Sequence, residues 1–331
     1  IQSERNFVDY SLFVSYFPLL VAGPIERATH LLPQLKAKRE FNFEKAKEGI
    51  YQIVWGLVKK VVIADSCANY ANEVFNHYPT MNSLSLALGA IYFAFQIYGD
   101  FSGYSDIALG TSKLFGIDLL KNFNYPYFSR DIAEFWRRWH ISLTTWFRDY
   151  LYIPLGGSKG SKWFQVRNTF IIFLVSGFWH GASWTYVFWG FINAIYFIPL
   201  LLLKRNRKNV DDIALGFDFG SVKTIFNILI TFLITCFAWI FFRAKTIHDA
   251  FAYIQKMFED LNFSKQYFSI ERYNYDLLPL VLVFIVVEWN NRTKIEPISG
   301  KYSWVKLSLS LAALLALGVF SDYKEFIYFQ F

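Results

Sequence analysis

The chain has 331 residues, of which 54% are hydrophobic and 21% aromatic, and it carries a formal net charge of +7. This aromatic content far exceeds that of an ordinary soluble domain, and several apolar runs approach the roughly 20 residues that cross a bilayer. We therefore predict one polytopic membrane domain over residues 1–331. The basic residues cluster in short loops between apolar runs, which argues against nucleic-acid binding.

The first apolar segment, residues 7–24, contains Pro18 and Pro24. Because proline interrupts the helical hydrogen-bond ladder, we predict a short or re-entrant segment here. The later apolar runs predict membrane segments at residues 49–65, 84–99, 168–182, 184–203, 222–242, 277–289 and 304–320. Loops rich in lysine and arginine alternate with loops poor in them, so the positive-inside rule places the basic loops in the cytoplasm.

A mixed region, residues 111–167, carries nine lysines and arginines. We place it at the cytoplasmic face, partly as helices that lie in the interface. Asp131 followed by Glu134 predicts a helix start of the capping-box type. This helix should run to about Tyr150, before a proline and a Gly-Gly pair end it.

One ionisable side chain, His180, interrupts the apolar stretch at residues 168–191. A histidine that faced lipid would be costly, so His180 should face a protein interior or a wet cavity. Gly177 and Gly181 form a small-xxx-small pair, which predicts close approach of a neighbouring helix. Two roles stay open for His180: a catalytic or proton-carrying residue in a tunnel, or one partner of an interhelical hydrogen bond.

A second histidine, His140, lies within EFWRRWHISLTTWFRDY, where Trp136 should share its helical face. With Arg137 and Arg138, it predicts a polar pocket at the cytoplasmic mouth that binds an anionic donor, such as a phosphate-bearing cofactor. An aromatic interfacial helix whose arginines contact lipid phosphates is an equally open interpretation.

Two carboxylates, Asp100 and Asp106, lie in YGDFSGYSDIALG at residues 98–110. Buried carboxylates need partners, so we expect a structural role in which they pair with the arginines of residues 130–148. The remaining histidines read as solvated surface residues, and Cys67 and Cys236 have neither disulfide nor metal-ligand spacing.

Five stretches carry a recognisable pattern: FPLLVAGPIER at 17–27, WGLVKKVVIAD at 55–65, YGDFSGYSDIALG at 98–110, NFNYPYFSRDIAEFWRRWHISLTTWFRDYLYIPLGGS at 122–158 and SGFWHGASWTYVFWG at 176–190. Together they resemble the membrane-bound O-acyltransferase (MBOAT) superfamily, and within it the alginate O-acetyltransferase branch. The closing FIYFQF at 326–331 is also similar to the family's C-terminus. The resemblance implies additional N-terminal helices that this chain does not contain.

This resemblance implies an all-α polytopic membrane protein, built as a helical bundle around a tunnel with interfacial and re-entrant helices. It implies O-acyl transfer, most simply O-acetyl transfer, from a cytoplasmic thioester to an extracytoplasmic hydroxyl during modification of a cell-surface polysaccharide. The donor would be acetyl-CoA or another acyl thioester, with no tightly bound cofactor and no metal. His180 would be the family's catalytic histidine and general base, and His140 the second polar position of the site.

The resemblance also implies a multi-pass protein of the cytoplasmic (inner) membrane that works with the polysaccharide synthesis machinery. Its longest predicted external loop, residues 243–276, is too short to grip a polymer, so we expect an extracytoplasmic acetyltransferase as partner. Three alternatives stay open: D-alanyl transfer in teichoic acid modification, a proton-coupled transporter or flippase with His180 as relay, and a non-catalytic scaffold.

Overall fold

The computed structural model describes residues 4–210, 222–259, 261, 277–294, 298–320 and 326–327, and every regular element within them is helical. The α-helices are α1 (Phe7–Val14), α2 (Ala28–Lys36), α3 (Phe43–Leu57), α4 (Asp65–Asn76), α5 (Ser83–Leu114), α6 (Ile132–Arg138), α7 (Ile141–Phe147), α8 (Lys162–His180), α9 (Trp184–Leu202), α10 (Val222–Arg243), α11 (Ile247–Glu259), α12 (Leu277–Asn291) and α13 (Ser303–Leu317). Short helical turns are η1 (Phe17–Leu19), η3 (Tyr78–Thr80) and η4 (Pro126–Phe128), and η2 (Val58–Ala64) and η5 (Arg148–Tyr152) are π-helical.

Within the described residues, three helices are long and apolar enough to cross a membrane, namely α5, α9 and α10. The helices α12 and α13 are apolar but shorter. The predicted all-α, multi-pass membrane fold is therefore confirmed. The first apolar segment is short, as predicted, because α1 ends at Val14 and Pro18 lies in the separate turn η1. The predicted external loop 243–276 contains α11, and its remainder from 262 lies outside the described residues.

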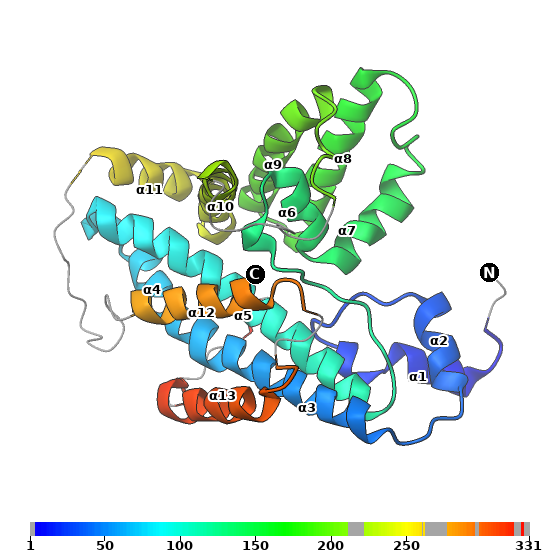
Figure 1. The fold of residues 1–331 in the computed structure, drawn as a ribbon. Helices are drawn as coiled ribbons and strands as arrows, with labels where there is room; N and C mark the ends of the chain where they lie inside the picture. Colours follow the sequence, from blue (N-terminus) through cyan, green and yellow to red (C-terminus); the bar gives the residue numbers. More distant parts are fainter. Residues whose placement is uncertain are drawn as a thin grey trace.

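The 32-residue helix α5 is the axis of the molecule (Figure 1). The helices α3, η2 and α4 follow one another without a break and pack along it. A Cβ atom at Gly56 would lie 2.6 Å from the carbonyl oxygen of Gly103, and one at Gly49 would lie 2.5 Å from that of Gly110. The two helices therefore touch through their backbones at these glycines.

The helix α5 continues to Leu114, well beyond the predicted end of the run at residue 99. Its two carboxylates stay within the helix because lysines of η2 face them. Lys60 Nζ lies 2.7 Å from Asp100, and Lys59 Nζ lies 2.5 Å from Asp106. The predicted structural role of the two aspartates is thus supported, but the predicted arginine partners were wrong. The glycine contacts between α3 and α5 decide the pairing, because they bring η2 against α5.

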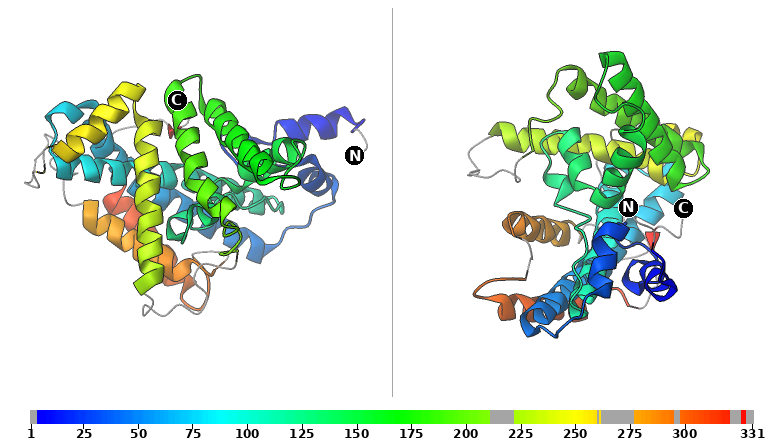
Figure 2. Two further views of the ribbon diagram at one scale, coloured as in Figure 1. Left: turned by 90° about the horizontal axis from the view of Figure 1, so that it is seen from above. Right: turned by 90° about the vertical axis from the view of Figure 1, so that its right-hand side faces the viewer.

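The helices α8 and α9 form an antiparallel hairpin. A Cβ atom at Gly177 would lie 2.2 Å from the carbonyl oxygen of Tyr186, and one at Gly190 would lie 2.2 Å from that of Phe173. The close helix approach predicted at Gly177 is therefore confirmed, with Gly190 as its counterpart on the facing helix, but Gly181, the other member of the predicted pair, lies just beyond the end of α8. Figures 1 and 2 show this hairpin on one side of α5 and the pair α12 and α13 on the other, with α10 crossing α5 steeply.

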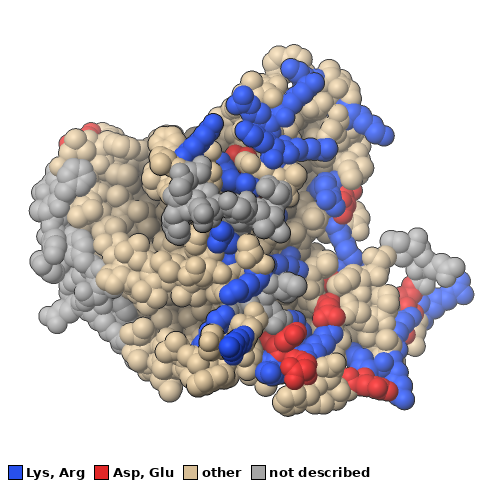
Figure 3. All heavy atoms as spheres, viewed as in Figure 1, with Lys and Arg blue, Asp and Glu red and all other residues tan. Residues whose placement is uncertain are grey.

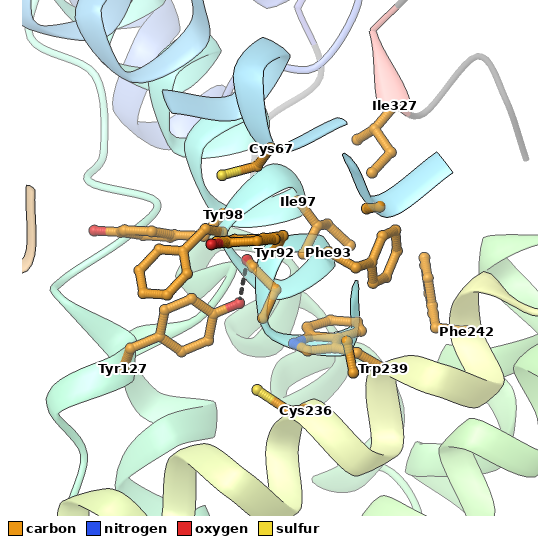
Figure 4. Close-up of a cluster of buried hydrophobic side chains, with 14 of the residues drawn as sticks. Cys67, Tyr92, Phe93, Ile97, Tyr98, Tyr127, Cys236, Trp239, Phe242 and Ile327 are labelled. Atoms are coloured by element: carbon orange, nitrogen blue, oxygen red, sulfur yellow. Dashed lines mark hydrogen bonds between the residues drawn. The ribbon is translucent and has the colours of Figure 1, made fainter. Parts of the chain in front are cut away.

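Aromatic side chains fill the space where α5 and α10 cross (Figure 4). Tyr127 packs against Tyr98 at 5.2 Å between ring centroids, and its hydroxyl donates to the carbonyl oxygen of Ala94 at 2.6 Å. On the far side of this core, Trp239 of α10 stacks on Trp189 of α9 at 5.5 Å. The core therefore joins the central axis to the α8–α9 hairpin.

The helix predicted from Asp131 to Tyr150 begins as expected, since Asp131 Oδ1 accepts from the Glu134 N–H at 2.8 Å. It does not continue, because α6 ends at Arg138 and His140 adopts a left-handed backbone conformation with φ of 43°. The segment 122–124 explains the break. It exchanges backbone hydrogen bonds with residues on both sides of His140, at 2.8 and 3.0 Å. These hydrogen bonds replace those that a continuous helix would form around His140.

Candidate active site

The structure brings His140 and His180 together at one small cavity of about 70 Å³. We call it the histidine cavity. It is lined by Trp136, Trp139, His140, Leu143, Thr144, Phe147, Ile172, Phe173, Ser176 and His180. This volume is several times the ~10–15 Å³ that one water molecule needs, so it admits a small polar group. The two histidines singled out in the sequence thus share one site, although 39 residues lie between them.

His180 is the last residue of α8. Its ring meets three aromatic rings edge-on, with centroid distances of 5.0 Å to Trp179, 5.3 Å to Trp189 and 5.1 Å to Phe242. The negative end of a helix dipole lies at the C-terminus, so this position stabilises an imidazolium more than an imidazole. Desolvation among the aromatic rings acts in the opposite direction and favours the neutral imidazole, the form that can accept a proton.

Three polar or aromatic residues close to His180 in the sequence, Ser176, Ser183 and Trp184, lie in different environments in the structure. Ser176 lines the histidine cavity. Ser183 caps α9, and its hydroxyl oxygen accepts from the Thr185 N–H at 3.3 Å. Trp184, which also follows His180 closely in the chain, is 76% exposed. Of these neighbours, Ser176 is the one positioned to orient a group in the histidine cavity.

His140 is buried at the junction of α6 and α7. Its Nδ1 lies 3.1 Å from Oδ1 of Asn122, and its ring meets Phe101 edge-on at 4.6 Å. Burial, with His180 close by, lowers the pKa of His140 well below its ordinary value. A non-glycine residue in the left-handed region is held there by its surroundings, and such positions concentrate at functional sites.

Two larger cavities adjoin this region. The N-terminal cavity, about 400 Å³, lies between His140, Trp179 and the segment 13–31. The charged cavity, about 590 Å³, is lined by Asn122 and Phe123 among others. Its charged lining residues are Glu44, Lys45, Glu48, Lys59, Asp106, Lys113, Asp118, Lys121 and Glu288. His140 therefore lines the N-terminal cavity, and its hydrogen-bond partner Asn122 lines the charged cavity.

Lysine side chains of the charged cavity differ in their partners. Lys59 and Lys45 face carboxylates, at 2.5 Å from Asp106 and 2.8 Å from Asp118. Lys121 instead donates to the amide oxygen of Asn124 at 3.0 Å, and burial lowers its pKa. Nothing in the sequence pattern indicated this cavity, because its residues come from four separate segments.

The three residues predicted to bind a donor are placed differently. Trp136 lines the histidine cavity and packs edge-on against Trp189 at 5.6 Å. Arg138 is buried and bonds Glu134 at 2.9 Å. Arg137 donates to the backbone carbonyls of residues 206 and 209, at 2.8 and 2.7 Å. In this structure both guanidinium groups bind groups of the protein itself, so donor binding by Arg137 and Arg138 stays a prediction.

A family model for the membrane-bound O-acyltransferases matches residues 2–254. The chain therefore belongs to the MBOAT family, which confirms the resemblance seen in its motifs. It is 40% identical over 258 residues to a peptidoglycan O-acetyltransferase of Helicobacter pylori. The aligned region covers 77% of this chain and 47% of that protein. It is 41% identical over 260 residues to a probable alginate O-acetylase AlgI of Pseudomonas aeruginosa, again 77% and 47%.

A more distant relative is a teichoic acid D-alanyltransferase of Bacillus subtilis, which is 28% identical over 248 residues, 71% of this chain and 61% of that protein. The first two relatives are thus more similar to this chain than the third. The chain spans about half the length of the O-acetyl-transferring relatives it matches.

Proposed function

We propose that this chain carries the acyl-transfer centre of a membrane O-acetyltransferase that modifies a cell-surface polysaccharide. One observation carries the proposal: His140 and His180 line the same small cavity, among aromatic side chains, in a member of the MBOAT family. The relatives' names give peptidoglycan and alginate as acceptors, and both polymers present sugar hydroxyls. The class of acceptor we propose is accordingly a polysaccharide hydroxyl.

In this proposal His180 is the general base. Its neutral imidazole takes the proton of the acceptor hydroxyl while the oxygen attacks the carbonyl carbon of the thioester. The carbon–sulfur bond then breaks, and the leaving thiolate takes the proton from the imidazolium to become a thiol. General base catalysis of this kind contributes about 10²–10⁴-fold to a rate. The aromatic walls would limit competing hydrolysis by excluding water.

The donor in this proposal is acetyl-CoA or another acyl thioester, which enters from the cytoplasmic side near Trp136, Arg137 and Arg138. The acceptor approaches from outside, by way of an extracytoplasmic acetyltransferase partner, and the protein lies in the cytoplasmic membrane. Higher identity to O-acetyl-transferring relatives than to D-alanyl-transferring ones supports acetyl as the group moved. A proton-coupled transporter would not consume a thioester. Consumption of an acyl thioester by the purified protein therefore distinguishes an acyltransferase from a transporter.

The test measures thiol release from acetyl-CoA by the purified membrane protein together with the proposed extracytoplasmic acetyltransferase partner, with alginate or peptidoglycan oligosaccharides as acceptors. His180→Ala should reduce acceptor-dependent thiol release to a few per cent or less, because the base is lost. His248→Ala, which removes an exposed histidine of α11, is the matched control and should leave the rate unchanged. Transfer above a few per cent in His180→Ala, with normal expression of both variants, would rule out the general-base role.

A further inference from the structure

The side chain of Asn122 has only one orientation that its neighbours allow. Its Oδ1 lies 3.3 Å from the backbone N–H of Ser142 and 2.9 Å from the hydroxyl of Ser142. A backbone N–H can only donate, so the atom that faces it must be the amide oxygen. The Ser142 hydroxyl in turn accepts from the Ile25 N–H at 2.9 Å, so its own hydrogen points to Asn122. Two donors thus fix the oxygen in place.

The backbone of Asn122 is held as firmly as its side chain. Its carbonyl oxygen accepts from the Ile141 N–H at 2.8 Å, and its side-chain nitrogen points to the Ser105 hydroxyl at 3.4 Å. Asn122 is only 1% exposed. It therefore presents a fixed acceptor to whatever group lies beside it.

That neighbouring group is Nδ1 of His140, 3.1 Å from the same oxygen. Because the oxygen only accepts, Nδ1 must carry the hydrogen. A neutral imidazole has one N–H, so Nε2 then holds the lone pair. The lowered pKa of His140 is consistent with a neutral ring. His140 lines both the histidine cavity and the N-terminal cavity, so the edge of the ring away from Asn122 is the one left to face them.

We propose that Asn122 is a positioning residue that locks His140 in the Nδ1–H tautomer, so that His140 enters the site as an acceptor through Nε2. This inference rests on the proposed function for its catalytic meaning. In acyl transfer, a neutral His140 held this way accepts a substrate hydrogen or relays a proton, and it does not donate to the oxyanion. Stabilisation of the oxyanion falls to other groups.

The direct test does not depend on activity. The protein is prepared in detergent with ¹³C,¹⁵N-labelled histidine, and the His140 signals are identified by their loss in His140→Gln. We expect the shifts of a protonated Nδ1 and an unprotonated Nε2. In Asn122→Leu this signature should give way to the Nε2–H form or to a mixture. An Nε2–H form in the unsubstituted protein would overturn the proposal.

Kinetics supply the second test. Asn122→Leu should lower kcat about 10–100-fold with little change in the KM for the thioester, as is typical when the group that orients a functional histidine is removed. Asn122→Asp keeps an oxygen that accepts from Nδ1 and should restore most of kcat. Its negative charge stabilises the imidazolium and raises the pKa of His140. The acidic limb of the pH–rate profile should therefore move to higher pH.

Asn168→Leu is the matched control. Asn168 is also 1% exposed and donates to backbone carbonyls at 3.1 and 3.2 Å, but it lies more than three turns of α8 from His180. It should cost stability without changing the tautomer of His140. Equal loss of kcat in both leucine variants, with an unchanged His140 signature, would reduce Asn122 to a structural residue. An Nδ1–H signature in a protein that transfers no acetyl group would uphold the positioning and refute the proposed function.

Discussion

At the scale of single residues, the two arginines before His140 have separable roles. Arg138 bonds the buried Glu134, whose other oxygen is held at 3.0 Å by Arg130. Arg137 reaches outward to backbone carbonyls beyond the end of α9, which places it nearer the end of the site where the donor is proposed to enter.

We predict that Arg137→Ala raises the KM for the thioester more than it changes the KM for the acceptor. Arg137→Lys should restore only part of the effect, because lysine lacks the planar fork of the guanidinium. Arg138→Ala should act mainly on stability, with a loss of about 1.5–3 kcal/mol from its charged hydrogen bonds to Glu134, which keeps its contacts to Arg130. Steady-state kinetics and thermal unfolding in detergent check these outcomes. A change confined to the acceptor KM in Arg137→Ala would contradict the donor assignment.

The ion pair between buried Lys59 and half-buried Asp106 gives a second prediction at this scale. Lys59→Met leaves Asp106 with its hydrogen bond from Gln52 but without its cation, and should destabilise the protein by about 1.5–3 kcal/mol. The double variant Lys59→Met/Asp106→Leu should recover much of that loss, because it removes both charges. Thermal unfolding of the two single variants and the double variant measures the coupling. Additive losses would show that the two side chains do not depend on each other.

At the scale of elements, glycine contacts set the distance between α3 and α5. A Cβ atom at Gly103 would lie 2.7 Å from the carbonyl oxygen of Gly56. Backbone atoms cannot move aside as a side chain can, so Gly103→Ala should separate the helices and disturb η2. We predict a clear fall in the thermal unfolding temperature in detergent. Ser308→Ala, on the exposed face of α13, is the control and should have little effect. An unfolding temperature unchanged by Gly103→Ala would mean that the helices are not in backbone contact.

Sequence patterns predicted some elements well and others poorly, for physical reasons. The runs 184–203 and 222–242 match α9 and α10 closely, because long apolar stretches leave few alternatives. The length of α5 was underestimated, since its aspartates are satisfied by lysines some forty residues away. The break at His140 depends on pairing with residues 122–124, which no local pattern indicates.

The same distinction holds for the candidate site. His180 and His140 could be found from the sequence, because an ionisable side chain stands out in an apolar run. Asn122 could not, although it lies in one of the quoted motifs, because its contact requires the left-handed turn at His140. The cavities could not be predicted from the sequence either, because their lining residues come from segments far apart in the chain.

At the scale of the whole molecule, the visible face has an uneven charge distribution. On this face, Figure 3 shows lysines and arginines mainly in the right-hand part of the view, many of them over the region that Figure 1 assigns to α7, α8 and α9. Lys204, Arg205, Arg207 and Lys208 follow α9 directly. Under the positive-inside rule this face would be cytoplasmic, which agrees with a donor that enters there.

The most direct test of the account is sidedness of transfer in sealed liposomes. The reconstituted protein receives acetyl-CoA in the lumen, and molecules whose basic face points inward are selected by protease protection of that face. Peptidoglycan or alginate oligosaccharides are added outside, with and without the extracytoplasmic acetyltransferase. We predict acetylation outside that depends on luminal acetyl-CoA, on His180 and on the added partner. Full-rate acetylation by His180→Ala liposomes, or with acetyl-CoA supplied only outside, would contradict the account.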